Sequence, residues 1–468
     1  MFPLYNFLLT VAAAFLVPYY GLKILFTGKY RTSAGPKFGF NPRDVYERMR
    51  GNPRIWIHAV SVGEVTAAAP IVAALRADFP EACLILSTGT ETGQEMARRL
   101  IREATALIYF PLDIPCVIRK MIRLIRPEMV VLTETELWPN FLRVCRERGI
   151  RLAMVNGRLS PRSFRKYRIT RFFWRRILKD VCVMGVISET DAGRARAIGM
   201  EPSRIRVLGN AKYDGLAARV SPDIQAEAAV RLNIAVGERV LVAGSTHEGE
   251  ESVVLEVFRK LLTAYPDFKL ILVPRHIERA AAVMQRVRQA GFEDSLTLTE
   301  IEQGRKRKNE RVLVVDAIGI LFKLYSLATV VYCGGSLVPR GGQNILEPAA
   351  WGKVVLYGPS MEDFRDEKAL LEEAGAGITV KNGPELAEKI LALLRDPDAM
   401  AGRGLNAGRV VAANRGAAKR YAALIREVLA ATPPPAGRIP ATSRPPTPAV
   451  DEAVRCSSSG SAPVSPDS

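Results

Sequence analysis

Glu64 is placed where a carboxylate could act as a base. It follows the apolar run RIWI and the turn Ser61-Val62-Gly63, and it begins an alanine-rich helical pattern that ends near Arg76. A carboxylate at a helix N-terminus can simply cap the free backbone N–H groups. In a cleft, the same carboxylate could remove a proton from a substrate hydroxyl. The sequence alone leaves both roles open.

Groups suited to binding phosphate follow two apolar runs in the second half of the chain. The segment AGSTHEGEE places Gly244, Ser245 and Thr246 directly after the run VLVAG, so that hydroxyl and N–H groups converge on one point. Arg275 follows the run LILV and could neutralise a phosphate at the same edge of a sheet. One glycine loop would be weak evidence, but several at successive strand ends favour a phosphate-bearing ligand.

A third glycine-rich segment, residues 334–352, adds polar groups that suit a ribose. Asn344 is expected to open a helix there, and Glu347 lies about one turn later. A carboxylate in this position can hold the paired hydroxyls of a ribose. The two side chains could instead form a capping box that only stabilises the helix.

Metal-binding patterns are weak in this sequence. The three histidines, His58, His247 and His276, are scattered at strand ends and are more typical of hydrogen-bonded structural residues. The single D-x-D, Asp396 to Asp398, stands in an apparent turn. The six cysteines include no CxxC pair, which predicts neither disulfides nor a thiolate site and fits a reducing compartment. We expect no metal and no cofactor.

The elements that must position these groups form two similar halves. Apolar runs of strand length alternate with helical patterns from residue 54 to about residue 430, which is typical of parallel sheets in an α/β protein. Residues 207–215 contain Gly and Asn and are predicted to be a hinge. The pattern predicts two Rossmann-like domains facing each other across a cleft, with ligands beyond the C-terminal strand ends. The expected strands are RIWIHA, CLILS, ALIYF, MVVLT, RLAMV, CVMGVIS, VLVAG, KLILV, RVLVV, TVVYCGG, VVLYG and AGITV.

The formal net charge of +18 is concentrated in the first 208 residues, which hold 33 of the 66 basic side chains and only 17 of the 48 acidic ones. This half should face an anionic partner: a membrane surface, a phosphorylated substrate or nucleic acid.

An uncharged run occupies residues 2–22, and about 20 apolar residues suffice to cross a bilayer. Basic residues follow the run rather than precede it, which argues against a signal peptide and predicts a cytoplasmic body on the inner membrane. A buried core helix is the alternative. We expect residues 1–30 to form a single uncleaved membrane anchor.

The segment SPRSFRKYRITRFFWRRILK, residues 160–179, carries eight basic residues, no acidic residue and five aromatic residues. At helical spacing this predicts a cationic face beside an aromatic one, as in interfacial helices, although an ordinary amphipathic helix is the alternative. After residue 430 the chain becomes rich in Pro, Ser and Ala, and we expect residues 431–468 to be disordered.

Seven motifs in order resemble those of the 3-deoxy-D-manno-octulosonic acid (Kdo) transferases of lipopolysaccharide assembly. The resemblance extends from the uncharged N-terminal run to about residue 430. The motifs are SVGE (61–64), TETELWPN (133–140), NGRLSPRS (156–163), GNAKYD (209–214), STHEGEES (245–252), LVPRHIER (272–279) and GGSLVPRGGQNILEPAA (334–350).

The resemblance implies a glycosyltransferase-B fold and an inverting transfer of Kdo from CMP-Kdo to the lipid A precursor lipid IV(A). Residues 31–208 are implied to bind the acceptor and residues 209–430 to bind CMP-Kdo. It implies Glu64 as the general base, with Glu134 and Lys212 supporting the transition state. The implied CMP contacts are Pro274, Arg275, Ile318, Gly319, Ile320, Asn344, Ile345, Leu346 and Glu347.

Two other functions stay open at this point. A transferase or epimerase of nucleotide-diphosphate sugars would have the same two-domain fold. A membrane-tethered basic protein could bind nucleic acid, but the sequence contains no recognisable nucleic-acid module, and we expect no nucleic-acid partner.

Overall fold

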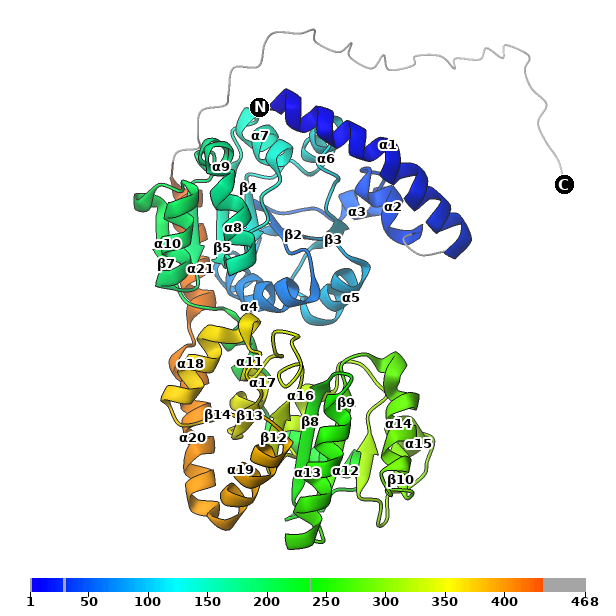
Figure 1. Cartoon of the computed structure of the whole chain (residues 1–468). Coiled ribbons are helices and arrows are strands. Elements are labelled where there is room, and N and C mark those ends of the chain that lie inside the picture. The colour runs from blue at the N-terminus through cyan, green and yellow to red at the C-terminus, as the bar shows by residue number, and fades with distance from the viewer. Residues whose placement is uncertain (1, 28–30, 236, 432–468) are drawn as a thin grey trace, which may run out of the picture.

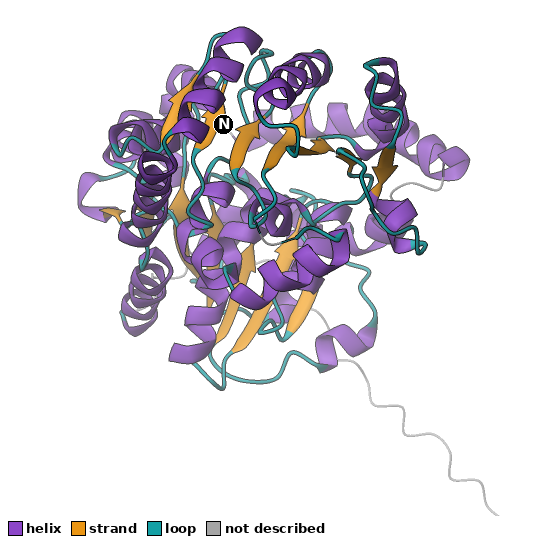
Figure 2. Cartoon of the chain, turned by 90° about the horizontal axis from the view of Figure 1, so that it is seen from below, coloured by secondary structure: helices purple, strands orange, loops and turns teal. Residues whose placement is uncertain are grey.

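Two parallel sheets of seven strands each form the body of the protein. The computed structural model describes residues 2–27, 31–235 and 237–431. Helices cover both faces of each sheet, and the two sheets belong to separate domains (Figures 1 and 2). The predicted α/β fold with two Rossmann-like domains is therefore confirmed, and each of the twelve expected strands is present.

The first sheet has the strand order β3-β2-β1-β4-β5-β6-β7. Alternate side chains of β1 enter the two cores that lie on opposite faces: Trp56 packs with one core, and Ile55 and Ile57 pack with the other. The strands are β1 Arg54–His58, β2 Cys83–Thr88, β3 Ala106–Tyr109, β4 Met129–Thr133, β5 Arg151–Gly157, β6 Val183–Val186 and β7 Ile205–Val207. The helices are α2 Arg31–Lys37, α3 Arg43–Glu47, α4 Val62–Asp78, α5 Glu91–Leu100, α6 Pro115–Ile125, α7 Pro139–Glu147, α8 Pro161–Ile169, α9 Arg171–Leu178 and α10 Glu189–Ile198.

The second sheet has the order β10-β11-β9-β8-β12-β13-β14, again between two apolar cores. Its strands are β8 Val240–Thr246, β9 Lys269–Pro274, β10 Ser295–Thr297, β11 Val312–Val314, β12 Val330–Cys333, β13 Val355–Tyr357 and β14 Gly377–Thr379. Its helices are α11 Lys212–Arg219, α12 Pro222–Leu232, α13 Glu250–Ala264, α14 Ala280–Gln289, α15 Leu298–Glu302, α16 Leu321–Tyr325, α17 Leu346–Ala350, α18 Arg365–Glu373, α19 Gly383–Arg395 and α20 Pro397–Ala413.

The last helix, α21 (Ala417–Ala430), returns to the first domain (Figure 1). Tyr421, Leu424 and Ile425 are buried in the core that includes residues of β1 and α4. Asp214 at the start of α11 accepts hydrogen bonds from the backbone N–H groups of Gly416 and Ala418, which fixes the turn before α21. The two domains are therefore joined twice, through residues 208–211 and through α21.

Helix α1 (Phe2–Thr27) begins against the first domain. The hydroxyl of Tyr5 donates to Asp113 Oδ2 (2.8 Å), and Asn140 Nδ2 donates to Asn6 Oδ1 (2.6 Å). Pro18 lies inside the helix. Among the described residues, no helix is long and apolar enough to span a bilayer. The prediction of a membrane-spanning anchor over residues 1–30 is therefore not supported, because the start of this run forms polar contacts with the domain; residues 1 and 28–30 lie outside the described part.

The basic and aromatic segment at 160–179 forms two helices rather than one. Helix α8 ends at Ile169 and α9 begins at Arg171, and Thr170 between them accepts a hydrogen bond from Trp174 Nε1 (2.8 Å). The predicted tail falls almost entirely on residues 432–468, which lie outside the described part of the chain.

Candidate active site

The site is built where the strand order of the first sheet reverses. Strands β1 and β4 are neighbours there although five other elements, α4 to α6, separate them in sequence. Glu64 follows β1 and Glu134 follows β4, so both carboxylates lie beyond the C-terminal ends of adjacent strands. Ligands of open α/β sheets bind at this reversal point.

Glu64 lies in the first turn of α4 and is 7% exposed. Its carboxylate accepts hydrogen bonds from the backbone N–H of Val60 (2.7 Å) and from the Ser61 hydroxyl (3.2 Å). Burial raises the pKa of Glu64 to about 8, and the nearby charges of Glu134 and Glu136 add to this, although the Val60 hydrogen bond opposes it. The carboxylate therefore fixes the turn before the helix and is also a stronger base than an exposed glutamate.

Glu134 has a backbone conformation that side chains other than glycine rarely adopt. Its φ is 55°, and its N–H donates to the Val155 carbonyl (2.9 Å). Such a conformation costs of order 1 kcal/mol and is often found at functional sites. Its Oε1 accepts a hydrogen bond from Lys212 Nζ at 3.2 Å, and both side chains are partly exposed. This ion pair joins the loop after β4 to the first residue of α11.

Two asparagines hold the chain just before Lys212. Asn156 Oδ1 accepts from the Ala211 N–H (2.9 Å), and Asn210 Oδ1 accepts from the Lys212 N–H (3.1 Å). Asn156 itself has a φ of 51°. The segment predicted to be a hinge thus presents Lys212 to the first domain from a fixed position.

A cavity of about 500 Å³ opens beside these residues and is lined by both domains. Glu134, Glu136 and Arg158 line it from the first domain, and Arg340 and Arg365 line it from the second. Arg158 also donates to the backbone carbonyl of Asp363 across the gap. Glu64 is not among the lining residues, although the charges of Glu134 and Glu136, which do line the cavity, act on it.

Glu136 is a candidate that the sequence reading missed. It lines the cavity, accepts a hydrogen bond from Trp138 Nε1 (3.1 Å), and has a pKa raised by burial and by Glu134. The E-x-E spacing of the motif TETELWPN was the available signal. The basic residues Arg158, Arg194, Arg340 and Arg365 were also missed, because they come from four distant segments.

The candidate donor residues gather at one edge of the second sheet. Pro274 ends β9, and the Arg275 N–H donates to the Thr246 carbonyl at the end of β8 (2.9 Å). Ile318 and Gly319 follow the neighbouring strand β11; Ile318 is 74% exposed and Gly319 has a φ of 87°. Ile320, by contrast, packs against the apolar core.

The segment before α17 combines two kinds of residue. Asn344 Oδ1 accepts from the Leu346 N–H (3.2 Å), and Asn344 Nδ2 donates to Glu347 Oε1 (3.2 Å). Burial raises the pKa of Glu347, while the charges of Arg219 and Arg275 lower it. The Ile345 and Leu346 side chains are buried in the core. Any contact of these two residues with a nucleotide would therefore come from their backbone.

None of the three histidines forms a side-chain contact with Glu64 or Glu134 among the described residues. His58 is fully buried, stacks on Phe110 at 3.7 Å between ring centroids, and has a pKa lowered to about 3 by burial. His247 and His276 lie at the donor edge with their rings 5.7 Å apart. Within the described residues, no group of three His, Cys, Asp or Glu side chains could hold a metal ion.

The sequence matches known proteins over most of the chain, including both domains. Residues 33–215 match the family model described as 3-deoxy-D-manno-octulosonic-acid transferase. A transferase of this description from Chlamydophila psittaci is 30% identical over 79% of this chain and 83% of its own length. The chain belongs to the Kdo transferase family. The family member from Haemophilus influenzae is 29% identical over 91% of this chain and 98% of its own length. The Aquifex aeolicus member is 30% identical over 76% and 89%.

Solved structures agree on the fold of this Kdo transferase family member. A putative UDP-N-acetylglucosamine 2-epimerase from Listeria monocytogenes superposes with a TM-score of 0.55 at 17% identity, over 82% of this chain and 99% of that one. A glycosyltransferase from Rickettsia africae gives 0.54 at 15% identity, over 81% and 100%. At these identities the likeness establishes the two-domain architecture, and family membership distinguishes the chain as a glycosyltransferase.

Proposed function

We propose that the chain transfers Kdo from CMP-Kdo to the lipid A precursor lipid IV(A), with inversion at the anomeric carbon. One observation carries the proposal beyond family membership: Glu64, Glu134 and Lys212 gather at the reversal point of the first sheet, beside a cavity lined by both domains. Such a site can hold a nucleotide sugar on one side and a hydroxyl acceptor on the other.

In the proposed reaction, Glu64 takes the proton of the acceptor hydroxyl as the oxygen attacks the anomeric carbon of Kdo. The new C–O bond forms on the face opposite the bond to the phosphate, and the electrons of that breaking bond leave with CMP. A carboxylate with a pKa of about 8 is matched to accept a proton near neutral pH. Because Glu64 is 7% exposed and is not among the residues that line the cavity, we expect a small local movement to accompany acceptor binding.

Positive charge is available for the leaving phosphate. Lys212 projects from the start of α11, and Arg275 lies beyond the end of β9 with no side-chain hydrogen bond among the described residues. Preorganised cations of this kind stabilise charge that develops in a transition state. On the donor side, Asn344 and Glu347 form a hydrogen-bonded pair suited to the ribose hydroxyls, and the exposed Ile318 beside Gly319 can contact the base.

The acceptor is proposed to reach the site from a membrane surface. One side of α1 and the start of α9 expose large apolar side chains, including Phe15 (74%) and Phe172 (68%). An apolar cavity of about 460 Å³ lies between these helices, with Leu137 and Trp138 of the Glu136 loop in its wall. Helix α9 and its neighbour α8 also carry basic residues, including Arg168, Arg175 and Arg176. Interfacial helices combine apolar and cationic faces in this way, so we propose peripheral contact with the cytoplasmic face of the inner membrane.

A transfer assay tests the proposal. The purified chain is incubated with tetraacylated lipid A precursor and CMP-Kdo generated in situ, and separately with UDP-sugars, and the glycolipid is measured by mass spectrometry. We expect Kdo-bearing product and release of CMP only with CMP-Kdo. Transfer or epimerisation with a UDP-sugar, and none with CMP-Kdo, would contradict the proposal and favour the nucleotide-diphosphate-sugar alternative.

A further inference from the structure

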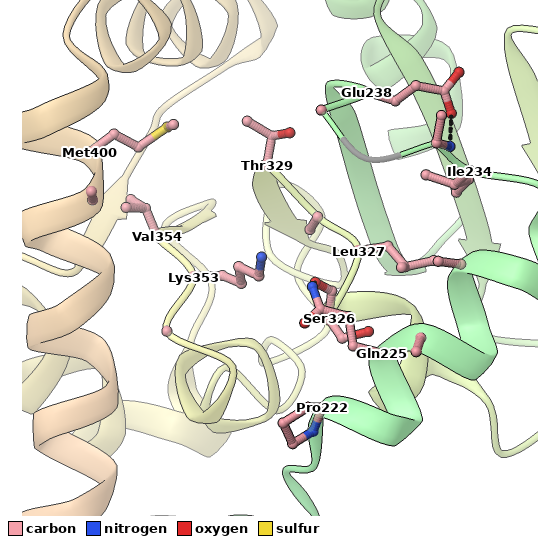
Figure 3. A pocket seen from close by; sticks show the side chains of 17 residues that line it. Pro222, Gln225, Ile234, Glu238, Ser326, Leu327, Thr329, Lys353, Val354 and Met400 are labelled. Atoms are coloured by element: carbon pink, nitrogen blue, oxygen red, sulfur yellow. Dashed lines mark hydrogen bonds between the residues drawn. The ribbon is translucent and has the colours of Figure 1, made fainter.

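A cavity larger than the one between the domains lies elsewhere in the described chain. It has a volume of about 660 Å³ and lies in the second domain, at the N-terminal ends of β8, β12 and β13. The donor residues follow the opposite, C-terminal ends of this sheet. The cavity (Figure 3) is therefore separated from the proposed active site by the length of the strands.

The walls of this cavity are mostly small and apolar. Alanines of α12, residues of the segment after α16 and Met400 of α20 belong to these walls. A concave site of this size with apolar walls and few polar groups is suited to a small organic molecule. The apolar lining consists of Pro222, Ala226, Ala229, Ile234, Ala235, Leu327, Ala328, Val354, Met400 and Ala401.

Among the described residues of the lining, Lys353 is the only basic one, and its side chain extends into the cavity (Figure 3). Its backbone N–H donates to the Pro348 carbonyl, but among the described residues its ammonium group has no hydrogen bond or ion pair. Burial lowers its pKa, with no acidic neighbour to offset the effect. An amine held this way lacks a counter-ion that a ligand could supply.

The other polar side chains of the lining already have partners. Glu238 is paired with Arg307 and accepts from the Ala235 N–H (3.0 Å). Gln225 Nε2 donates to the Ser326 carbonyl (3.1 Å), and Thr329 Oγ1 accepts from the Val240 N–H (2.9 Å). Lys353 is therefore the group that remains to recognise a ligand.

Two short helices connect this cavity to the donor site. Helix α16 begins directly after Ile320 and ends before Ser326. Helix α17 begins directly after Ile345 and is followed by Trp351 to Lys353. Trp351 Nε1 donates to the Phe322 carbonyl (2.8 Å), which links the two helices. Each helix thus has one end at the proposed CMP contacts and the other at the cavity.

We propose that this cavity is a second ligand site, for a small monocarboxylate with an apolar body whose carboxylate pairs with Lys353. One cation balances one negative charge, so a carboxylate fits better than a phosphate with two. Because α16 and α17 join the cavity to the donor residues, occupancy should change the affinity for CMP; this coupling rests on the proposed function.

Titration calorimetry of the full chain with submicellar octanoate tests the site, with octanol as the uncharged probe. We expect saturable octanoate binding that weakens at least tenfold in Lys353→Met and is retained in Lys353→Arg. Octanol binding should change less than threefold. Lys260→Met, on the exposed side of α13, is the matched control and should bind octanoate as the unchanged chain does. Absence of saturable octanoate binding, or equal binding by Lys353→Met, would overturn the proposal.

The coupling is measured as the CMP dissociation constant with and without saturating octanoate. We expect a change of about fivefold or more, which disappears in Lys353→Met. The same CMP affinity in both conditions would overturn the coupling. Neither measurement requires turnover, so a failure here is distinguishable from a failure of Kdo transfer.

Discussion

Two glutamates hold corresponding positions in the two domains. Glu64 follows the first strand of the first sheet and lies in the first turn of α4; Glu250 follows the first strand of the second sheet and begins α13. Both are buried. Glu64 accepts two hydrogen bonds, whereas Glu250 accepts five, and those five are hydrogen bonds from Tyr332 Oη and from the N–H groups of His247, Gly335, Ser336 and Leu337.

This difference in hydrogen bonding suits Glu250 to a structural role and leaves Glu64 able to exchange a proton. Glu250 satisfies the backbone of the glycine loop after β12 and has no capacity left for a substrate. Glu64 has few partners, carboxylate neighbours and a raised pKa. The glutamate in this position therefore stabilises the fold of the second domain. In our proposal, the corresponding glutamate of the first domain transfers a proton.

The largest expected effect is on turnover in Glu64→Gln. An amide keeps the shape of the side chain but accepts no proton, so we expect kcat to fall by about 10²–10⁴-fold. CMP affinity should stay within about twofold, since the residue belongs to the acceptor side. Transfer rates measured by mass spectrometry, beside CMP titration, would contradict the account if turnover remained within tenfold of the unchanged enzyme.

Support of the transition state by the Glu134–Lys212 pair predicts the next largest effect. Lys212→Met and Glu134→Gln should each lower kcat by about 10²-fold, because each removes charge from the site. The double variant should be less impaired than the product of the two single effects, because the residues are paired. Single-turnover rates provide the test, and losses that multiply independently would show that the pair does not act as a unit.

Two Glu→Gln substitutions are predicted to change the free energy of unfolding in opposite directions. Glu250→Gln should lower the free energy of unfolding by about 2–4 kcal/mol, because the amide NH₂ would face backbone N–H donors in a buried site. Glu64→Gln should raise it by about 1–3 kcal/mol at pH 9 and leave it nearly unchanged at pH 4. The folded state keeps the Glu64 carboxyl protonated up to a pKa of about 8, whereas the unfolded state loses this proton near the ordinary pKa of 4.5. The unfolding free energy of the unchanged chain therefore falls as the pH rises between these two values.

Urea denaturation at the two pH values measures both variants. Equal destabilisation by the two substitutions at pH 9 would show that Glu64 stabilises the fold as much as Glu250 does, and would contradict the proposed difference between the two residues.

The smallest expected effect concerns Glu136. Its charge contributes to the raised pKa of Glu64 less than burial does, so Glu136→Gln should shift the pH–rate profile toward lower pH. The gain in kcat/KM at pH 7 should be about twofold to fivefold. A profile that moves to higher pH, or does not move, would remove Glu136 from the electrostatics of the base.

Most of the fold was predictable from the sequence, because buried parallel strands appear as continuous apolar runs. Strands β7 and β10 were missed because neither IRV nor SLT is a continuous apolar run, and β7 is mostly exposed. The break at Thr170 and the return of α21 to the first domain depend on tertiary packing, which periodicity does not show. The N-terminal run predicted a span because it is uncharged, yet its Tyr5 and Asn6 contact the domain.

The residue types of the candidate site were predictable from the sequence, but their arrangement in space was not. Motif spacing pointed to Glu64, Glu134 and Lys212, and their roles remain predictions. The positive φ of Glu134 and the absence of Glu64 from the cavity lining depend on the loop conformation. Glu136 and Lys353 become candidate functional residues only because the structure places them in the walls of cavities.

The pH dependence of kcat/KM, compared between the unchanged enzyme and Glu64→Gln, tests proton transfer by Glu64 most directly. The account predicts that kcat/KM rises with pH to a plateau with an apparent pKa of about 8, and that the residual activity of Glu64→Gln lacks this rise. The same rise in Glu64→Gln would assign the titration to another group and contradict the account.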